Sequence, residues 1–291
     1  MTCGRSPWHA EPVNELEHKL KQRLAELAPV LVAFSGGVDS TWLARAARHA
    51  PGGDGMLAVT VDLPMMPRRE VEDARELAEH LDLPYEQVDM EGLLQLPAFT
   101  VHPPGRCYYC KRAIFERLNT VARERGLATV VEGSTCDDRP EDRPGLRALR
   151  ELHVLSPLEE TGFTKQDVRE ASRRHGLPTA DKPASPCLAT RVPFGEAVTP
   201  GRLRRIEAAE TAVRECGFRE LRVRDEWPTA RVEIELPADE VQARRALCAQ
   251  IEARLRALGY REVKFDARGV RSGRYADQAR DGEDGHEPDP D

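Results

Sequence analysis

The chain has 291 residues and a formal net charge of −7, from 43 basic and 50 acidic residues. No apolar run approaches the roughly 20 residues of a membrane-spanning helix, and residues 1–10 contain no apolar signal-peptide core, so we expect a cytoplasmic protein without membrane contact. Residues 276–291 hold seven acids and one arginine, which accounts for −6 of the charge and predicts a disordered acidic tail. The net charge therefore does not exclude an anionic partner.

Strand-like and helix-like segments alternate through the first part of the chain. Predicted helices lie at 14–28, around Trp42–Ala46 and at 68–81, 112–125 and 164–175, and predicted strands at 30–34, 56–61, 85–89 and 128–132. The first strand is short, apolar and partly β-branched, which is typical of a strand buried on both faces. The alternation predicts a doubly wound α/β domain with a parallel sheet, in which ligands bind at the carboxyl ends of the strands.

The pattern changes after a proline-rich stretch at 177–200. Helices at 202–216 and 239–258 and strands at 220–224, 230–236 and 262–267 predict a smaller α+β domain. We therefore predict four regions: a flexible N-terminus at 1–12, the α/β domain at 13–196, the α+β domain at 197–275 for substrate binding or oligomerisation, and the acidic tail at 276–291.

A glycine-containing loop joins the first buried strand to the next helix, and it consists of Ser35, Gly36, Gly37, Val38, Asp39 and Ser40. Glycines allow a tight turn and a close approach of the backbone to a ligand. Successive amide N–H groups and a helix N-terminus then favour a phosphate. Ser35 and Ser40 add hydroxyl donors, and Asp39 is suited to hold a Mg²⁺ ion that bridges phosphates. The six residues therefore predict a nucleotide site.

This hexapeptide, SGGVDS, resembles the signature of the PP-loop ATP pyrophosphatases. The resemblance implies that ATP is cleaved between its α- and β-phosphates, giving an adenylylated substrate and pyrophosphate. It also implies that the backbone near Thr60, at the tip of the second strand, contacts the adenine or ribose of ATP.

Seven cysteines, an odd number, favour reduced thiols over a disulfide framework. Cys107 and Cys110 form a CxxC motif at the start of a helix, and Cys187 lies in the proline-rich stretch. Three thiolates suit a [4Fe–4S] cluster with one open iron. A redox dithiol, a zinc site completed by a histidine such as His102, and buried apolar thiols are alternatives that the residues leave open.

Further segments resemble the LarE family of ATP-dependent sulfur transferases, which build the nickel-pincer cofactor of lactate racemase. Besides SGGVDS they are CYYCK at 107–111, residues 132–138 with 143–148, KPASPCLATRVPFG at 182–195, and residues 222–224. The resemblance implies that the carboxylates of pyridinium-3,5-biscarboxylic acid mononucleotide are adenylylated and then converted to thiocarboxylates. One departure is Gly133–Ser134–Thr135, where the family usually has Gly-Thr-Asn.

The same resemblance implies which cysteines take part in the sulfur transfer. Cys187 aligns with the family's sulfur-donating cysteine. Because this chain also carries Cys107 and Cys110, it resembles the members in which three thiolates hold a [4Fe–4S] cluster with an extra sulfide. Lys182 is expected to stabilise the adenylate phosphate, although a solvated surface lysine fits the sequence equally well.

The implied substrate is strongly anionic, and guanidinium groups bind carboxylate and phosphate in a bidentate manner. We therefore expect Arg191, Arg222 and Arg224 to clamp the substrate, and Glu210 to bind its ribose or the edge of the pyridinium ring. A solvated surface charge is the alternative for each of them, in a chain of which 32% is charged.

The resemblance further implies a homo-oligomer, with a sulfide donor protein and other enzymes of the cofactor pathway as partners. Two other functions fit the sequence. A PP-loop tRNA thiolase would use the arginines of the smaller domain on a phosphate backbone, but acids alternate with them as on ordinary helix faces, so we expect no nucleic acid. An ATP-binding metal or redox sensor would release no pyrophosphate.

Overall fold

The computed structural model describes residues 15–138, 144–235, 241–266, 269–270 and 275, and the predicted flexible N-terminus and acidic tail lie outside them. Contacts divide the chain into two compact units: 1–91 with 107–185, and 92–106 with 186–291. This division falls at 185–186, before the expected boundary at 196–197, and the transfer of 92–106 to the second unit was not expected. Within the described ranges, no helix is both long and apolar enough to cross a membrane.

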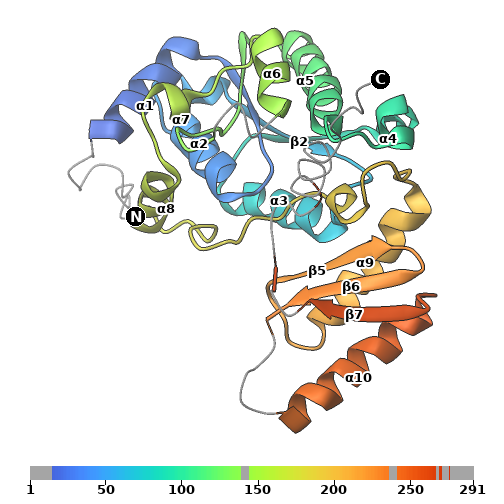
Figure 1. Ribbon diagram of the computed structural model, residues 1–291. Helices are drawn as coiled ribbons and strands as arrows, with labels where there is room; N and C mark the ends of the chain where they lie inside the picture. The colour runs from blue at the N-terminus through green and yellow to red at the C-terminus, as the bar shows by residue number, and fades with distance from the viewer. Residues whose placement is uncertain (1–14, 139–143, 236–240, 267–268, 271–274, 276–291) are drawn as a thin grey trace, which may run out of the picture. The chain divides into compact units, whose positions relative to one another are not determined.

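The first unit is a four-stranded parallel sheet with helices on both faces (Figure 1). The strand order is β3-β2-β1-β4, which confirms the predicted doubly wound α/β fold. Its helices and strands are α1 (Glu15–Leu27), β1 (Val30–Ala33), α2 (Val38–Arg48), β2 (Leu57–Asp62), α3 (Arg68–His80), β3 (Tyr85–Asp89), α5 (Arg106–Glu124), β4 (Thr129–Val131), α6 (Pro144–Glu151), α7 (Pro157–Glu160) and α8 (Lys165–Arg174).

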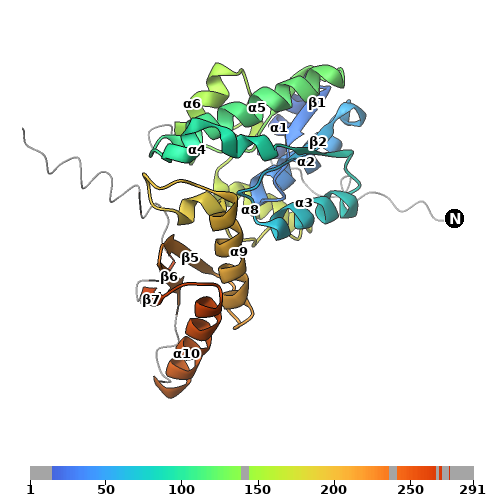
Figure 2. The same ribbon diagram turned by 90° about the vertical axis from the view of Figure 1, so that its right-hand side faces the viewer.

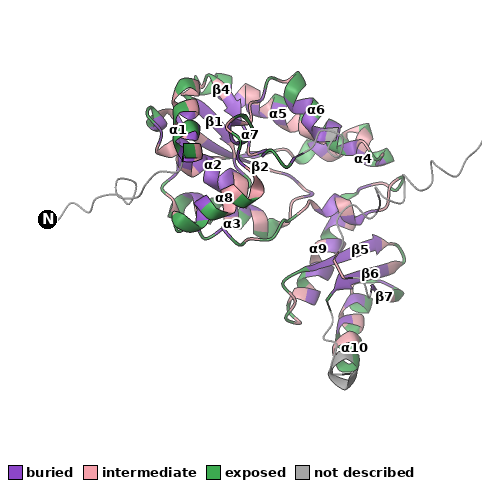
Figure 3. Cartoon of the chain, turned by 60° about the vertical axis from the view of Figure 1, so that its left-hand side comes forward, coloured by how far each residue is buried: buried purple, intermediate pink, exposed green. Residues whose placement is uncertain are grey.

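Successive side chains of β1 point to opposite faces of the sheet and join two different apolar clusters. Val30 and Val32 join residues of α1, α2, α3 and α8 on one face of the sheet. Leu31 joins residues of α5 and α6 on the other face. Purple colouring along the strands and the inner sides of these helices shows the same burial (Figure 3). Because β1 is buried on both faces, its carboxyl end and the loop that follows it are fixed by the core.

The second unit is built on a three-stranded mixed sheet. Its elements are α4 (Pro97–Val101), the 3₁₀ helix η5 (Leu188–Arg191), α9 (Pro200–Arg214), β5 (Leu221–Glu226), β6 (Thr229–Ile234), α10 (Val241–Ala257) and β7 (Glu262–Asp266). β5 and β6 pair antiparallel, and β6 and β7 pair parallel. The helices α9 and α10 (Figure 2) contribute to one core with Leu221 and Val223. Arg222 and Arg224, which alternate with these residues, therefore lie on the other face of the sheet.

Packing of Phe99 and His102 explains why 92–106 belongs to the second unit. The carbonyl oxygen of Phe99 accepts from the N–H of Val198 at 2.9 Å, and Nδ1 of His102 donates to the carbonyl oxygen of Pro193 at 3.0 Å. Burial, helped by the charge of Arg106, lowers the pKa of His102 to about 4. The ring is therefore neutral at physiological pH and acts as a packed structural group.

Candidate functional site

The loop at 35–40 is held by its own hydroxyl groups. The backbone N–H of Ser35 donates to Oγ of Ser40 at 3.2 Å, and the two serine hydroxyls lie 3.0 Å apart. Oγ of Ser40 also donates to the carbonyl oxygen of Gly37 at 3.3 Å. Gly37 is the N-cap of α2, so the loop leads directly into a helix N-terminus. A loop that leads into a helix N-terminus fits the predicted phosphate site, and phosphate binding there stays a prediction.

Gly36 has a φ of +65°, and a Cβ added there would lie 3.0 Å from the Cα and Cβ atoms of Ala74. Gly36→Ala is therefore expected to lower the free energy of unfolding by about 2 kcal/mol, through backbone strain and the clash with α3. Gly37→Ala is the matched control, because Gly37 has a φ of −82° and its added Cβ would meet only Oγ of Ser35, at 3.3 Å. Urea unfolding measures both, and an equal loss in the two variants would contradict the argument.

A cavity of about 370 Å³ lies over this loop, inside the first unit. Its wall includes the ends of β1 and β2, the middle of α5, the segment after β4, and Lys165 at the start of α8. Thr60 is part of the wall, and its hydroxyl donates to the carbonyl oxygen of Phe34 at 2.7 Å. The cavity thus occupies the carboxyl edge of the parallel sheet, where a ligand is expected in such folds.

Lys165 joins two carboxylates at the cavity. Its ammonium group forms ion pairs with Asp39 and with Oδ2 of Asp138, the latter at 3.4 Å. Its backbone N–H donates to Oδ2 of Asp137 at 2.5 Å. Carboxylates that converge on one cation are also the donors that Mg²⁺ prefers, so the residues fit the ion expected at Asp39. Lys165 was not among the predicted site residues.

One local signal in the sequence marks the position of Lys165. Thr164 caps α8, and its side chain and that of Asp167 form a capping box. This motif predicts where α8 begins. Because α8 follows the short helix α7 and not a strand of the sheet, the motif does not predict that its first residue lies at the cavity.

Lys182, which was predicted to act on the adenylate phosphate, lies beside the loop. Nζ of Lys182 donates to the carbonyl oxygen of Gly36 at 3.3 Å and pairs with Glu70 at 2.8 Å. The ammonium group is thus next to the backbone that the sequence assigns to the phosphates. Its action on a phosphate stays a prediction.

The three predicted cluster ligands are divided between the two units. Cys107 and Cys110 lie in the first turns of α5, three residues apart and therefore on one side of the helix. Lys111, the next residue, contributes to the wall of the cavity. Cys187 belongs to the second unit and is the N-cap of η5. Among the described residues, no group of three or more His, Cys, Asp or Glu side chains is placed to hold a metal ion, and the [4Fe–4S] cluster stays a prediction.

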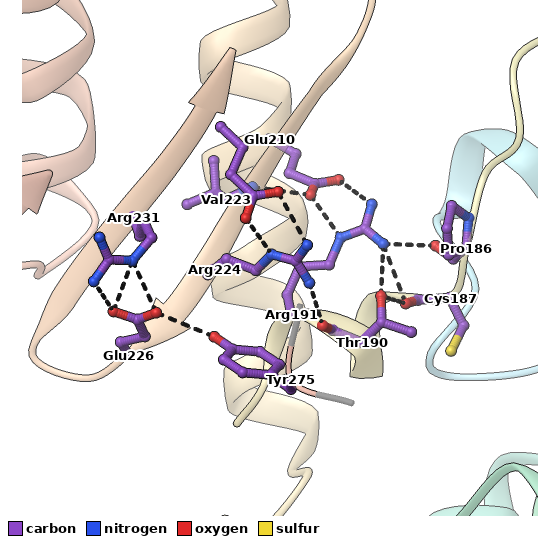
Figure 4. A network of polar contacts seen from close by, with 11 residues as sticks. Pro186, Cys187, Thr190, Arg191, Glu210, Val223, Arg224, Glu226, Arg231 and Tyr275 are labelled. Atoms are coloured by element: carbon purple, nitrogen blue, oxygen red, sulfur yellow. Dashed lines mark hydrogen bonds and ion pairs between the residues drawn. The ribbon is translucent and has the colours of Figure 1, made fainter. Parts of the chain in front are cut away.

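Three of the four predicted substrate residues, Arg191, Glu210 and Arg224, lie close together in the second unit (Figure 4). Arg191 donates to both carboxylate oxygens of Glu210, at 2.8 and 3.2 Å. Arg224 binds Glu233 through two hydrogen bonds of 3.0 Å and donates to the carbonyl oxygen of Thr190 at 2.7 Å. Glu233, which is fully buried, was not predicted. Carboxylates of the protein itself thus pair with Arg191 and with Arg224.

Arg222 completes this group. Burial lowers the pKa of Arg222, and the positive charges of Arg191 and Arg224 lower it further, while Glu233 and Glu210 oppose the change. Like charges therefore act on Arg222, and an anion bound beside it would relieve their repulsion. Its position on the same face of β5 as Arg224 agrees with the alternation read from the sequence.

Tyr275 adds an aromatic surface that the sequence analysis did not single out. The centre of its ring lies 5.4 Å from the guanidinium carbon of Arg224, and its hydroxyl is 3.4 Å from Oε1 of Glu226 (Figure 4). Its ring meets that of Phe194 edge to face, with the centres 6.3 Å apart. Tyr275 thus covers the guanidinium group that the sequence assigns to the substrate.

Comparison with known proteins finds one family model and several proteins of similar sequence. A family model of NAD synthase matches residues 10–134. An uncharacterized protein of Synechocystis sp. is 36% identical over 263 residues, which cover 90% of this chain and 96% of that protein. A tRNA-specific 2-thiouridylase of Syntrophus aciditrophicus is 29% identical over 212 residues, or 60% of this chain and 54% of that protein.

A third relative carries a more specific name. The pyridinium-3,5-bisthiocarboxylic acid mononucleotide synthase of Lactiplantibacillus plantarum is 34% identical over 254 residues, which cover 87% of this chain and 91% of that protein. A match of this length extends into both units of the chain. The chain therefore belongs to the LarE family of pyridinium-3,5-bisthiocarboxylic acid mononucleotide synthases, within the PP-loop superfamily of ATP-using enzymes.

Proposed function

We propose that this protein is an ATP-dependent sulfur transferase that adenylylates the carboxylates of pyridinium-3,5-biscarboxylic acid mononucleotide and converts them to thiocarboxylates for the nickel-pincer cofactor of lactate racemase. The observation that carries the proposal is the cavity over the loop at 35–40, with Lys165, Asp39 and Asp138 at its wall. It is supported by the name of the Lactiplantibacillus relative, which matches nearly the whole chain.

Adenylylation takes place at the cavity. The amides at 35–40 and the N-terminus of α2 bind the two phosphates that leave as pyrophosphate, and they stabilise the charge that develops there. Asp39 and Asp138 would hold a Mg²⁺ ion, which would neutralise the charge of these phosphates. Lys165 neutralises the two carboxylates before the nucleotide enters, and Lys182 holds the phosphate that remains on the substrate.

The substrate is an anion held by the arginines of the second unit. Arg191 and Arg224 place positive charge near Arg222. A carboxylate or phosphate of the substrate beside Arg222 would be attracted by all three guanidinium groups. Glu210 keeps Arg191 in place with two hydrogen bonds. Glu210 thus acts on the substrate through Arg191 in addition to any direct contact with its ribose or ring.

Cys107, Cys110 and Cys187 are the ligands of a [4Fe–4S] cluster, and the sulfur is delivered beside Cys187. The donor set fits such a cluster, because it offers three thiols, two of them on one side of a helix, and leaves one iron open. When bound, the cluster would carry the sulfide that becomes the sulfur of the product. The chain's own residues bind and orient the adenylate for that transfer.

The test supplies the purified full chain with ATP, Mg²⁺, sulfide and the biscarboxylic acid mononucleotide, after anaerobic cluster reconstitution. We expect AMP and pyrophosphate to appear only with this substrate, the product to gain the mass of an oxygen-to-sulfur exchange, and about four irons per chain. Pyrophosphate release with tRNA in place of the mononucleotide would favour the tRNA thiolase. ATP binding without pyrophosphate release would favour the sensor.

A further inference from the structure

A buried arginine contacts the sulfur atom of Cys187. Arg106 is 3% exposed, and its Nη2 donates to Sγ of Cys187 at a distance of 3.8 Å. Both residues belong to the second unit. Arg106 is also the first residue of α5, directly before Cys107 in the chain. The contact therefore places a permanent positive charge at the sulfur to which sulfur transfer is assigned.

Packing fixes the guanidinium group of Arg106. Its carbon lies 5.4 Å from the centre of the Phe99 ring, and the backbone N–H of Arg106 donates to the carbonyl oxygen of Pro103 at 2.9 Å. The neighbouring His102 is neutral, so it brings no second charge to the group. The guanidinium group thus sits on an aromatic face with its Nη2 directed at the sulfur.

The backbone of Cys187 is fixed independently of its side chain. Its carbonyl oxygen accepts from the N–H of Thr190 at 3.0 Å, from the hydroxyl of Thr190 at 2.9 Å and from Nη1 of Arg191 at 3.4 Å. These bonds fix the backbone of Cys187 but not the rotation of its side chain about the Cα–Cβ bond. The hydrogen bond from Arg106 reaches Sγ itself and therefore restricts that rotation.

We propose that Arg106 is a catalytic residue of the sulfur-transfer half-reaction, which orients the sulfur at Cys187 and balances its negative charge during attack on the acyl adenylate. This inference rests on the proposed function. In that step an electron pair of the transferred sulfide forms the new carbon–sulfur bond, the bond between the carbonyl carbon and the phosphate oxygen breaks, and AMP leaves with its electron pair. The sulfide gives up the bond that held it beside Cys187, and the thiocarboxylate is released. Arg106 acts as a fixed charge and transfers no proton.

The experiment compares Arg106→Gln and Arg106→Lys in the full chain with three measurements. Alkylation of Cys187 by iodoacetamide, followed by peptide mass spectrometry without ATP or substrate, is expected to slow about 10-fold in Arg106→Gln. Thiocarboxylate formation is expected to fall about 100-fold, mainly in kcat. Substrate-dependent ATP–pyrophosphate exchange is expected to stay within about twofold. Arg106→Lys, which retains the charge, is expected to recover part of both losses.

Arg202→Lys is the matched control, because Arg202 is another arginine of the second unit and its Nε donates to Asp225 at 2.6 Å. The inference is overturned if both Arg106 variants alkylate at the wild-type rate, or if Arg202→Lys slows alkylation equally. If Arg106→Gln fails to fold, Arg106→Lys is compared with Arg202→Lys. Slower alkylation of Cys187 in Arg106→Lys supports the inference, and equal alkylation rates in the two variants overturn it. Failure of the proposed function can be distinguished from failure of this inference. If the proposed function is wrong, the wild-type protein makes no thiocarboxylate, whatever the alkylation rates of the variants.

Discussion

Cys187→Ala is expected to reduce thiocarboxylate formation on the order of 10³-fold or more, while substrate-dependent ATP–pyrophosphate exchange continues. The substitution removes the thiol beside which the transferred sulfur is held, whereas the cavity proposed for the nucleotide is formed entirely by residues of the first unit. The two rates are measured in parallel, by mass spectrometry of the product and by exchange of labelled pyrophosphate into ATP. A separation of the two rates is the expected result.

Cys216→Ala is the control for this prediction. Cys216 lies in the same unit as Cys187, is partly buried against the core and donates from Sγ to the carbonyl oxygen of Ala212 at 3.4 Å. Its removal is expected to leave both rates at the wild-type level. If Cys187→Ala still forms product at the rate of Cys216→Ala, the sulfur does not pass through Cys187.

Glu233→Gln is expected to lower the free energy of unfolding by about 3 kcal/mol. Glu233 is fully buried and binds Arg224 through two hydrogen bonds of 3.0 Å, so glutamine leaves the arginine's charge buried without that carboxylate. Glu262→Gln on the neighbouring strand is the control. Glu262 is exposed and pairs with Lys264 at 3.1 Å, and its loss is expected to leave the free energy of unfolding close to that of the wild type. Urea unfolding at neutral pH measures both variants.

A double variant then separates stability from substrate binding. Arg224→Met with Glu233→Leu replaces the buried pair by apolar side chains of similar volume, and is expected to unfold within about 1 kcal/mol of wild type. Its KM for the mononucleotide is nevertheless expected to rise at least about 10-fold, because a charge on the substrate loses its guanidinium partner. A wild-type KM in the double variant would remove Arg224 from the substrate site.

The long elements could be predicted because each of them satisfies a local rule. The helix expected at 68–81 spans Arg68–His80, since Val71, Ala74 and Ala78 recur at helical spacing and are buried. No such pattern predicts α4 or α7, which have five and four residues, too few for the spacing to repeat. The assignment of 92–106 to the second unit depends on where Phe99 and His102 pack, and the sequence does not contain that information locally.

The site shows the same division between local and distant information. The loop at 35–40 could be predicted because its glycines, hydroxyls and following helix are contiguous in the chain. The contact between Lys165 and Asp39 joins residues 126 positions apart, so only the folded sheet reveals it. Arg191 and Arg224 were read as arginines directed at a ligand, and each proves to be held by a glutamate that no pattern pairs with it.

Glu210 also affects how the sheet of the second unit can meet another protein. β5 is the outer strand of the described sheet, and the backbone groups of such a strand can pair with a strand of another chain. Glu210 accepts the N–H of Val223 at 3.1 Å, and Nη2 of Arg202 donates to the carbonyl oxygen of Asp225 at 2.6 Å. Two side chains of α9 thus take the place of a neighbouring strand. A second copy could extend the sheet through β5 only by displacing them, so the glutamate that holds Arg191 also protects this edge against aggregation.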